Sequence, residues 1–258
     1  MWGHCDFHDV GGAWCGFCFP VAVLLKLGGA AVAWMNKRRF FPSDWSERLL
    51  LGIALLLQLA MLGVIAGALM QQQWLVAFTG SVVFVLTFTP AIIERQLDVR
   101  LPVEFTFVTC VFLYASFGLG EVQNFYYKFW WWDLLLHSCS ALVMGLIGFL
   151  SVYVFYMTHR IRLAPVYVAM VSFGFAVTLG SLWEVFEFLM DWLLGLNMQK
   201  SGLTDTMTDL MVNIVGSLIA AAIGYMYVRN GDSMIADKMI RSFVAKNPRL
   251  FDRGRTHP

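Results

Sequence analysis

The sequence predicts an all-α membrane protein, a polytopic bundle of transmembrane helices with seven spans. Of the 258 residues, 59% are hydrophobic and only 14% are charged, whereas about a quarter of the residues in a soluble domain are charged. Apolar runs long enough to cross the hydrocarbon, which takes about 20 residues in a helix, recur along the chain. A soluble fold could not bury so much apolar surface, so we expect one membrane domain to use nearly the whole chain.

Seven apolar segments make up the predicted spans. The first is the weakest because it contains Pro20 and Lys26, and a charge at the centre of a span costs about 2.5–3.5 kcal/mol. A six-span bundle with a re-entrant or interfacial N-terminal segment is therefore the alternative. The predicted spans are residues 12–35, 49–70, 74–93, 103–120, 134–157, 165–189 and 205–228.

The basic residues predict the orientation of these spans. Lys and Arg collect in alternate connections, at residues 37–48, 95–100 and 160–162, and again after residue 228. Since short cytoplasmic loops are rich in Lys and Arg, the seven-span bundle has its N-terminus outside and its C-terminus inside. A six-span bundle changes only the N-terminus. We expect a multi-pass protein of the inner or plasma membrane, with membrane lipids as its surroundings.

Three regions are predicted along the chain. Residues 1–45 form an N-terminal tail and the weak first span, and residues 46–228 form the transmembrane bundle. Residues 229–258 form a basic cytoplasmic tail with apolar residues at helical spacing, which predicts an interfacial helix on anionic lipid. Asn247-Pro248 should end that helix. The net charge of +1 for the whole chain argues against nucleic-acid binding, which needs a basic surface.

Polar residues gather at one end of the last three predicted spans. The fifth and seventh spans begin at the outer side and the sixth ends there, so the predicted topology brings these residues to one level of the bilayer. Their spacing of three or four residues places them on one face of each helix. They are Asp133 and His137 in the fifth span, Glu184, Glu187 and Asp191 in the sixth, and Asp205, Asp209 and Asn213 in the seventh.

Small residues continue each polar face and predict close packing of the three helices, because small side chains let membrane helices approach each other. We therefore expect the polar ends to converge in one outward-opening pocket. The small residues are Ala141, Gly145 and Gly148, then Gly174, Thr178 and Ser181, then Gly216, Ala220 and Gly224.

The residue types in this pocket predict cation binding. Several carboxylates close together repel one another, so they must share protons or hold a cation. Carboxylates with one imidazole suit Mg²⁺, Mn²⁺, Ca²⁺, Zn²⁺ or iron, and the sequence leaves the identity of a divalent metal open. The predicted metal ligands are His137, Glu184, Glu187, Asp205 and Asp209; the predicted catalytic residues are Asp133 and His137; further binding residues are Asn213 and Asp191.

Structural roles compete with these assignments for some of the residues. Asp205 lies in the first turn of its helix, where the helix dipole stabilises a carboxylate. Asp133 and Asp191 lie near the headgroups, where water can solvate them. Cys15-Gly16-Phe17-Cys18 is similar to a thioredoxin-type redox motif, but it lacks the surrounding alternation of strand and helix, so we do not favour redox chemistry.

Three functions fit such a pocket. The first is a metal-dependent enzyme that acts on a lipid-linked or amphiphilic substrate, with Asp133 as general base. The second is a transporter of cations or protons, because ionisable residues inside a membrane mark such pathways. The third is a scaffold whose acids only hold the bundle together. Transport needs a polar path across the bilayer, and the inner halves of these spans have few ionisable residues, which favours a site open to one side.

Three elements of the sequence resemble a known family. Trp132-Asp133-x3-His137, Trp183-Glu184-x2-Glu187 and the segment from Ser201 to Gly216 are similar to the pattern of the YjdF-like inner-membrane proteins. The acid, Asn and Gly of the last segment also resemble the VanZ-like proteins associated with glycopeptide tolerance. The resemblance covers roughly residues 100–228 and implies a bacterial membrane protein. It implies no specific reaction, because these families are largely without one.

Overall fold

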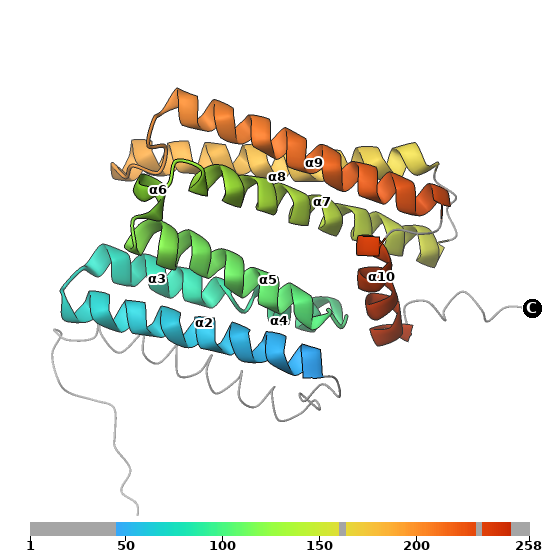
Figure 1. Cartoon of the computed structure of the whole chain (residues 1–258), viewed down its shortest axis with the longest axis horizontal. Helices are drawn as coiled ribbons and strands as arrows, with labels where there is room; N and C mark the ends of the chain where they lie inside the picture. Colours follow the sequence, from blue (N-terminus) through green and yellow to red (C-terminus); the bar gives the residue numbers. More distant parts are fainter. Residues whose placement is uncertain (1–44, 160–163, 231–233, 249–258) are drawn as a thin grey trace, which may run out of the picture. The chain divides into compact units, whose positions relative to one another are not determined.

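The computed structural model describes residues 45–159, 164–230 and 234–248, and every regular element in these ranges is a helix (Figure 1). This confirms the all-α prediction. The residues from Leu49 onward form one compact unit, and the predicted span at 12–35 lies outside the described residues. The helices of the bundle are α2 (Trp45–Met70), α3 (Trp74–Leu86), α4 (Thr89–Leu97), α5 (Val103–Leu113), α6 (Phe125–Lys128), α7 (Trp132–His159), α8 (Pro165–Leu194) and α9 (Leu203–Asn230).

Six of the seven predicted spans correspond to helices of the structure. Within the described ranges, five helices are long and apolar enough to cross a membrane, and the pair α3–α4, which is bent by 40°, makes a sixth if it forms one span. The span from Val103 to Val122 joins α5 to η1 (Tyr114–Val122), a stretch of π-helix. The orientation of these spans across the membrane stays a prediction.

The break between α3 and α4 has a local cause. Pro90 lies in the first turn of α4, and proline has no N–H to donate to the carbonyl four residues earlier. The Thr89 hydroxyl donates instead to the carbonyl of Leu86, at 2.7 Å. The hydroxyl of the buried Thr87 donates to the carbonyl of Phe84 and accepts a hydrogen bond from the Gln58 side chain of α2. Polar side chains thus satisfy backbone groups that the apolar surroundings could not.

Helices α7, α8 and α9 run alongside one another and contact each other pairwise (Figure 1). The contacts are close where α7 and α9 carry small residues, as predicted. A Cβ atom on Gly145 would lie 2.4 Å from the Cβ of Ala220, and one on Gly216 would lie 2.9 Å from the Cβ of Ala141. Helix–helix contact at this distance requires glycine.

The small residues predicted to line the packing face of α8 need correction. Gly174 and Thr178 are exposed, and a Cβ on Gly174 would meet nothing within 4 Å. The face that packs against the other helices carries Ser172, Ala176 and Gly180 instead. These residues precede Glu184 in steps of four, whereas the predicted residues precede it in steps of three, three and four. Both spacings lie near the same face of a helix, and the crossing of the helices selects one of them.

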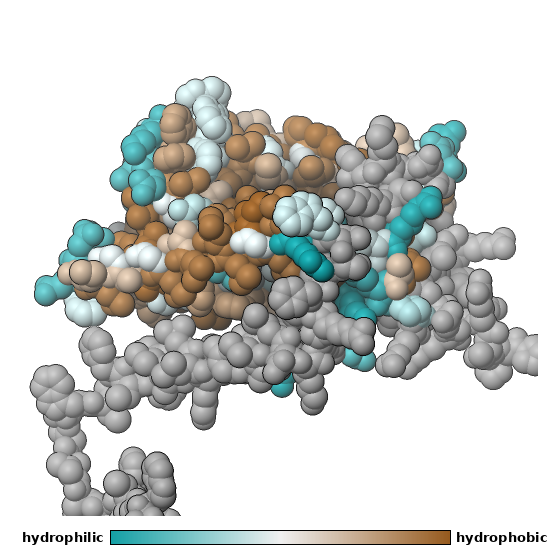
Figure 2. Space-filling view, turned by 60° about the horizontal axis from the view of Figure 1, so that its bottom comes forward, coloured by the Kyte–Doolittle hydropathy of each residue, from teal (hydrophilic) through white to brown (hydrophobic). Residues whose placement is uncertain are grey.

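The outer surface of the helices is strongly apolar. Many large side chains of the spans are exposed, among them Leu56, Phe78, Met170 and Val215, each at least half accessible. Figure 2 shows hydrophobic residues over most of one face, with hydrophilic residues toward its two ends. This distribution is that of helices surrounded by lipid.

Helix α10 (Met234–Lys246) packs against the bundle at the end where α7 ends and α8 begins. Ile240 and Phe243 are buried in an apolar cluster with Phe149, Val168 and Tyr227. The sequence predicted a helix on anionic lipid, but these two side chains contact protein. The helix ends just before Asn247-Pro248, as predicted.

Asn247 fixes the end of α10 to the connection between α4 and α5. Its side-chain oxygen accepts the Arg100 N–H at 2.6 Å, and its amide nitrogen donates to the carbonyls of Arg100 and Phe243 at 2.7 and 2.8 Å. We expect Asn247→Ala to lower the free energy of unfolding by about 1–3 kcal/mol, because buried backbone groups lose their partners. Thermal unfolding in detergent measures this. Asn230→Ala, at an exposed position, should change little; an equal loss in both variants would contradict the role of Asn247.

Candidate metal centre

The polar residues meet at one end of the unit formed by α7, α8 and α9. Helices α7 and α9 begin at this end and α8 ends there, so the first turns of two helices lie beside the last turns of the third. We call it the site end. The side chains of His137, Glu184 and Asp209 come from α7, α8 and α9 in turn, and all three are buried. The convergence predicted from helical spacing is therefore present in the structure.

His137 lies between the acids of the other helices. Its Nδ1 is 3.5 Å from Glu184 Oε1, and its Nε2 is 3.9 Å from Asp209 Oδ2 and 3.7 Å from Asp133 Oδ1. These distances exceed those of direct hydrogen bonds. One ligand atom each from His137, Glu184 and Asp209 lies within 4.8 Å of the others. The three side chains are therefore close enough together to form one candidate metal site.

The carboxylates at this point are buried without hydrogen-bond partners. Both oxygens of Glu184 and Oδ2 of Asp209 are inaccessible and accept no hydrogen bond, although the two residues are only 4% and 1% exposed. Buried polar groups in proteins are nearly always partnered, and an unpartnered buried charge is strongly unfavourable. A cation bound between the oxygens would remove this cost.

A second group of carboxylates shares Asp209. Oxygens of Asp133, Asp205 and Asp209 also lie within 4.8 Å of one another, and the first two residues are partly accessible. Lys200, from the connection between α8 and α9, places its Nζ 3.4 Å from Asp133 Oδ2. Its backbone N–H donates to Asp205 Oδ2 at 3.2 Å. This second group thus contains the side-chain ammonium of a lysine.

Two predicted site residues have partners elsewhere. Both oxygens of Asp191 accept backbone hydrogen bonds, from Met198 at 2.7 Å and from Gln199 at 2.8 Å, so this carboxylate holds the α8–α9 connection in place. Glu187 is buried on α8 and accepts a hydrogen bond from the Trp183 indole at 2.9 Å. Neither belongs to the two groups of converging ligand atoms found in the described residues.

Asn213 lies one turn beyond Asp209 on α9, facing α8. It is 2% exposed, and neither its side-chain oxygen nor its nitrogen has a hydrogen-bond partner. Its amide lies against Gly180, where an added Cβ would be 2.7 Å from the amide nitrogen. Gly180 therefore makes the room for Asn213, a role that the sequence analysis did not detect.

Four further residues at the site end were missed from the sequence: Lys200, and Tyr126 with its neighbours Ser116 and Gly120. The ring of Tyr126, in α6, lies under the Lys200 ammonium at 3.4 Å from its centroid, a cation–π contact. Its hydroxyl is 3.0 Å from the Ser116 hydroxyl, and burial raises the pKa of this phenol, which therefore stays neutral. Gly120 leaves space for the ring, since an added Cβ would lie 2.4 Å from it. Lys200 lies in the connection between the sixth and seventh predicted spans, and the fold of that connection could not be predicted.

The chain matches the model of a family described as "Predicted membrane protein (DUF2238)" over residues 49–230, which run from the second turn of α2 to the end of α9. It belongs to this family. An uncharacterised protein of Thermotoga maritima is 32% identical over 145 residues, which are 54% of this chain and 70% of that protein. No solved structure matches the chain.

In this DUF2238 member, the buried group has the composition of a metal centre. One imidazole and two carboxylates form a donor set found around Zn²⁺, Mn²⁺ and iron. At metal–ligand distances of about 2.0–2.2 Å, three ligand atoms that now lie within 4.8 Å of one another would move closer together around a bound ion. With three protein ligands, a bound metal would keep positions open for water or substrate, as catalytic sites do.

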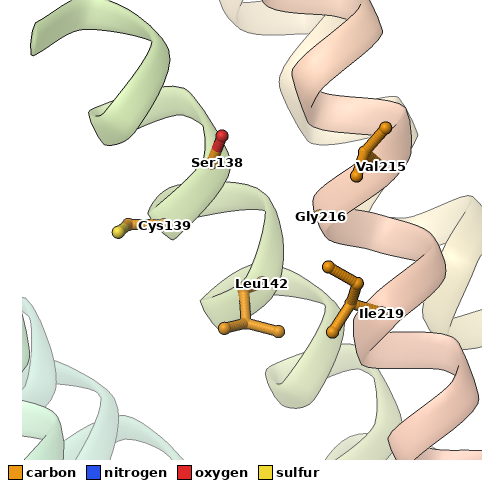
Figure 3. Close-up of a pocket in the computed structure, with 6 residues that line it drawn as sticks. All are labelled: Ser138, Cys139, Leu142, Val215, Gly216 and Ile219. Carbon is orange, nitrogen blue, oxygen red and sulfur yellow. The ribbon is translucent and has the colours of Figure 1, made fainter. Parts of the chain in front are cut away.

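A groove of about 210 Å³ lies one turn from the site, between α7 and α9. Its walls are mostly apolar, and it is open at the outer surface of the helices. In Figure 3, Ser138 and Leu142 face Val215 and Ile219 across the groove, and Cys139 points away from α9. The residues that line it are Ser138, Cys139, Leu142, Val215, Gly216 and Ile219.

Proposed function

We propose that this protein binds a divalent metal ion through His137, Glu184 and Asp209, and that the bound metal serves a membrane enzyme acting on an amphiphilic or lipid-linked substrate. The observation that carries the proposal is the burial, beside an imidazole, of the carboxylates of Glu184 and Asp209, of which three oxygens accept no hydrogen bond. Protein interiors rarely leave such groups unpartnered. A cation with open coordination positions accounts for both the burial and the convergence.

Asp133 suits the role of general base in this enzyme. It lies one turn before His137 on α7, is partly exposed, and has an oxygen 3.7 Å from the imidazole. A metal ion lowers the pKa of a bound water molecule, so a nearby carboxylate can accept its proton. Glu187 and Asp205, which were predicted as ligands, and Asn213 and Asp191, which were predicted to bind, surround the centre in this proposal.

The packing beyond the site favours an enzyme over a transporter. Away from the site end, α7, α8 and α9 close on one another through Gly145 and Gly148, whose added Cβ atoms would meet Ala220 and Phe175 at 3.0 Å or less. Farther on, Phe149, Val168 and Tyr227 form an apolar cluster. A path for ions would need polar groups and space in this region, whereas a catalytic site needs access from one side only.

The groove between α7 and α9 supports an amphiphilic substrate. It is mostly apolar, and its lining begins at Ser138, next to His137, and at Val215, two residues after Asn213. A hydrocarbon chain in the groove would leave the polar part of the same molecule near the metal ligands. The distribution of Lys and Arg supports an opening to the extracytoplasmic side of an inner or plasma membrane.

The resemblance to YjdF-like proteins agrees with membership of the DUF2238 family at the level of a membrane protein. We keep the finer assignment, and the likeness of residues 201–216 to VanZ-like proteins, as part of the proposal. Neither resemblance identifies a reaction, so the proposal depends on the chemistry of the site.

Metal content tests the proposal directly. The purified protein is incubated with Zn²⁺ or Mn²⁺, and the excess ion is removed. We then expect about one metal ion per chain by inductively coupled plasma mass spectrometry. Glu184→Gln should retain far less, because it removes a charged ligand while keeping the size of the side chain. Glu121→Gln, at an exposed acid of η1, should behave as the wild type. Wild-type protein that retains no more metal than Glu184→Gln would refute the metal centre.

Flux measurements separate the enzyme from the transporter. Because the packing beyond the site is closed, we expect proteoliposomes with the protein to show no more uptake of Mn²⁺ or protons than empty liposomes. The metal-retention assay on the same preparation shows that the site is intact. Uptake that depends on Glu184 would favour transport and contradict the enzyme.

A further inference from the structure

We infer that the site end has two cation positions and that the ammonium of Lys200 fills the second, so that the wild-type centre takes a single divalent ion. The second position is formed by Asp133, Asp205 and Asp209. The inference rests on the proposed function for the first position, where a metal would lie between His137, Glu184 and Asp209. It assigns Lys200 a role that its place in a connection does not suggest.

The contacts of Lys200 show a cation seated among these acids. Its Nζ lies 3.4 Å from Asp133 Oδ2 and 3.4 Å from the centre of the Tyr126 ring. Carboxylate on one side and aromatic face on the other are both favourable to a positive charge. The ammonium and its Asp133 partner are both more than three-quarters buried, so water screens this pair less than an exposed one.

Acidic side chains of α8 and α9 hold the loop that carries Lys200. Asp191 binds the backbone N–H groups of Met198 and Gln199, and the Lys200 N–H donates to Asp205. Gly202 has a φ of +64°, a left-handed conformation that favours glycine and returns the chain into α9. Several hydrogen bonds therefore hold the loop in a conformation that places Lys200 beside the acids.

The two positions differ in their internal partners although they share Asp209. In the first, the oxygens of Glu184 have no hydrogen-bond partner. In the second, the side-chain ammonium contacts Asp133 and the backbone N–H contacts Asp205. Among the described residues, the second position thus contains a lysine ammonium, whereas the first contains an imidazole and no lysine or arginine. Placing a single charge, rather than a second double charge, beside the metal also reduces repulsion between the two cations.

The number of bound metal ions tests the inference. We expect wild-type protein saturated with Mn²⁺ to bind one ion per chain, and Lys200→Met to bind two, because the substitution keeps the length of the side chain but removes the charge. The stoichiometry would double. Lys128→Met, at an exposed lysine of α6, is the matched control and should stay at one. Adding Asp133→Asn to Lys200→Met should return the number to one.

Electron paramagnetic resonance of the same samples adds an independent readout. An isolated Mn²⁺ gives a six-line spectrum, which we expect for the wild type, whereas two ions that share the Asp209 carboxylate should give a broadened, exchange-coupled spectrum in Lys200→Met. Size-exclusion chromatography and thermal unfolding show whether each variant is folded. Should Lys200→Met unfold, Lys200→Gln replaces it in the same measurements.

The outcomes distinguish this inference from the proposed function. Two ions in the wild type, or one ion in folded Lys200→Met, would overturn the inference and leave the metal centre standing. If the wild type binds none, the proposed function fails; one ion gained by Lys200→Met would still support the second position, and none gained would overturn it.

Discussion

Asp209→Asn should be more stable than the wild type without metal and less stable than the wild type with metal. In the presence of a chelator, we expect the variant to unfold at a higher temperature than the wild type, because the substitution removes a buried carboxylate that lies among other acids without a partner on Oδ2. Relief of such a group amounts to about 1–3 kcal/mol. With saturating Zn²⁺ or Mn²⁺ the order should invert, because the wild type gains binding energy and the variant does not.

The expected size of the metal effect follows from linkage. At a metal concentration of about 100 times the dissociation constant, binding to the folded state adds about 2.7 kcal/mol. Residues that only orient a ligand change metal affinity about 10–100-fold, so loss of a direct ligand should cost at least about 100-fold. Thermal unfolding of the wild type and the variant, once with chelator and once with metal, measures the difference in stability under both conditions.

Asp191→Asn provides the contrast for Asp209→Asn. This acid is at the same end of α8, but its oxygens are occupied by backbone N–H groups. We therefore expect it to lose stability equally with and without metal. If Asp209→Asn behaves in the same way, with no crossing of the two curves, Asp209 is structural and not a ligand.

The convergence of His137, Glu184 and Asp209 could be predicted because two simple periodicities determine it. Helical spacing places the polar residues of each span on one face, and the alternation of spans brings the first turns of α7 and α9 to the last turns of α8. Neither step needs the details of packing.

Lys200 and α10 could not be placed by such reasoning. The position of Lys200 depends on backbone hydrogen bonds to Asp191 in a loop without periodicity. The apolar face of α10 has the same pattern whether it contacts lipid or protein, and the contact of Asn247 with Arg100 joins residues 147 positions apart. The packing face of α8 was misassigned because steps of three and of four residues are both helical neighbours.

Gly145→Ala should strongly destabilise the three-helix unit. Gly145 is buried on α7, and the added Cβ would lie 2.4 Å from the Cβ of Ala220 on α9, a distance that forces the helix backbones apart. The displacement would also disturb the hydrogen bond of 2.7 Å that the buried Ser172 donates to the Gly145 carbonyl. Overpacking of this kind costs about 1–3 kcal/mol or more. We expect a correspondingly lower midpoint in detergent-denaturant titrations, and loss of metal retention as the site end opens.

A compensating substitution separates steric overlap from other causes. Ala220→Gly removes the opposing Cβ, after which the nearest atoms to a Cβ at position 145 are those of Ala176 and Ser172, at 3.7 Å, an ordinary contact distance. The double variant Gly145→Ala/Ala220→Gly should therefore recover most of the stability, since one methyl group has moved from α9 to α7 and the helix propensities of Gly and Ala offset each other. Gly174→Ala, where an added Cβ would meet nothing within 4 Å, should be neutral or stabilising by up to about 1 kcal/mol. If Ala220→Gly fails to rescue Gly145→Ala, the close approach of α7 and α9 does not explain the loss, and the distances at the site would have to be set by other contacts.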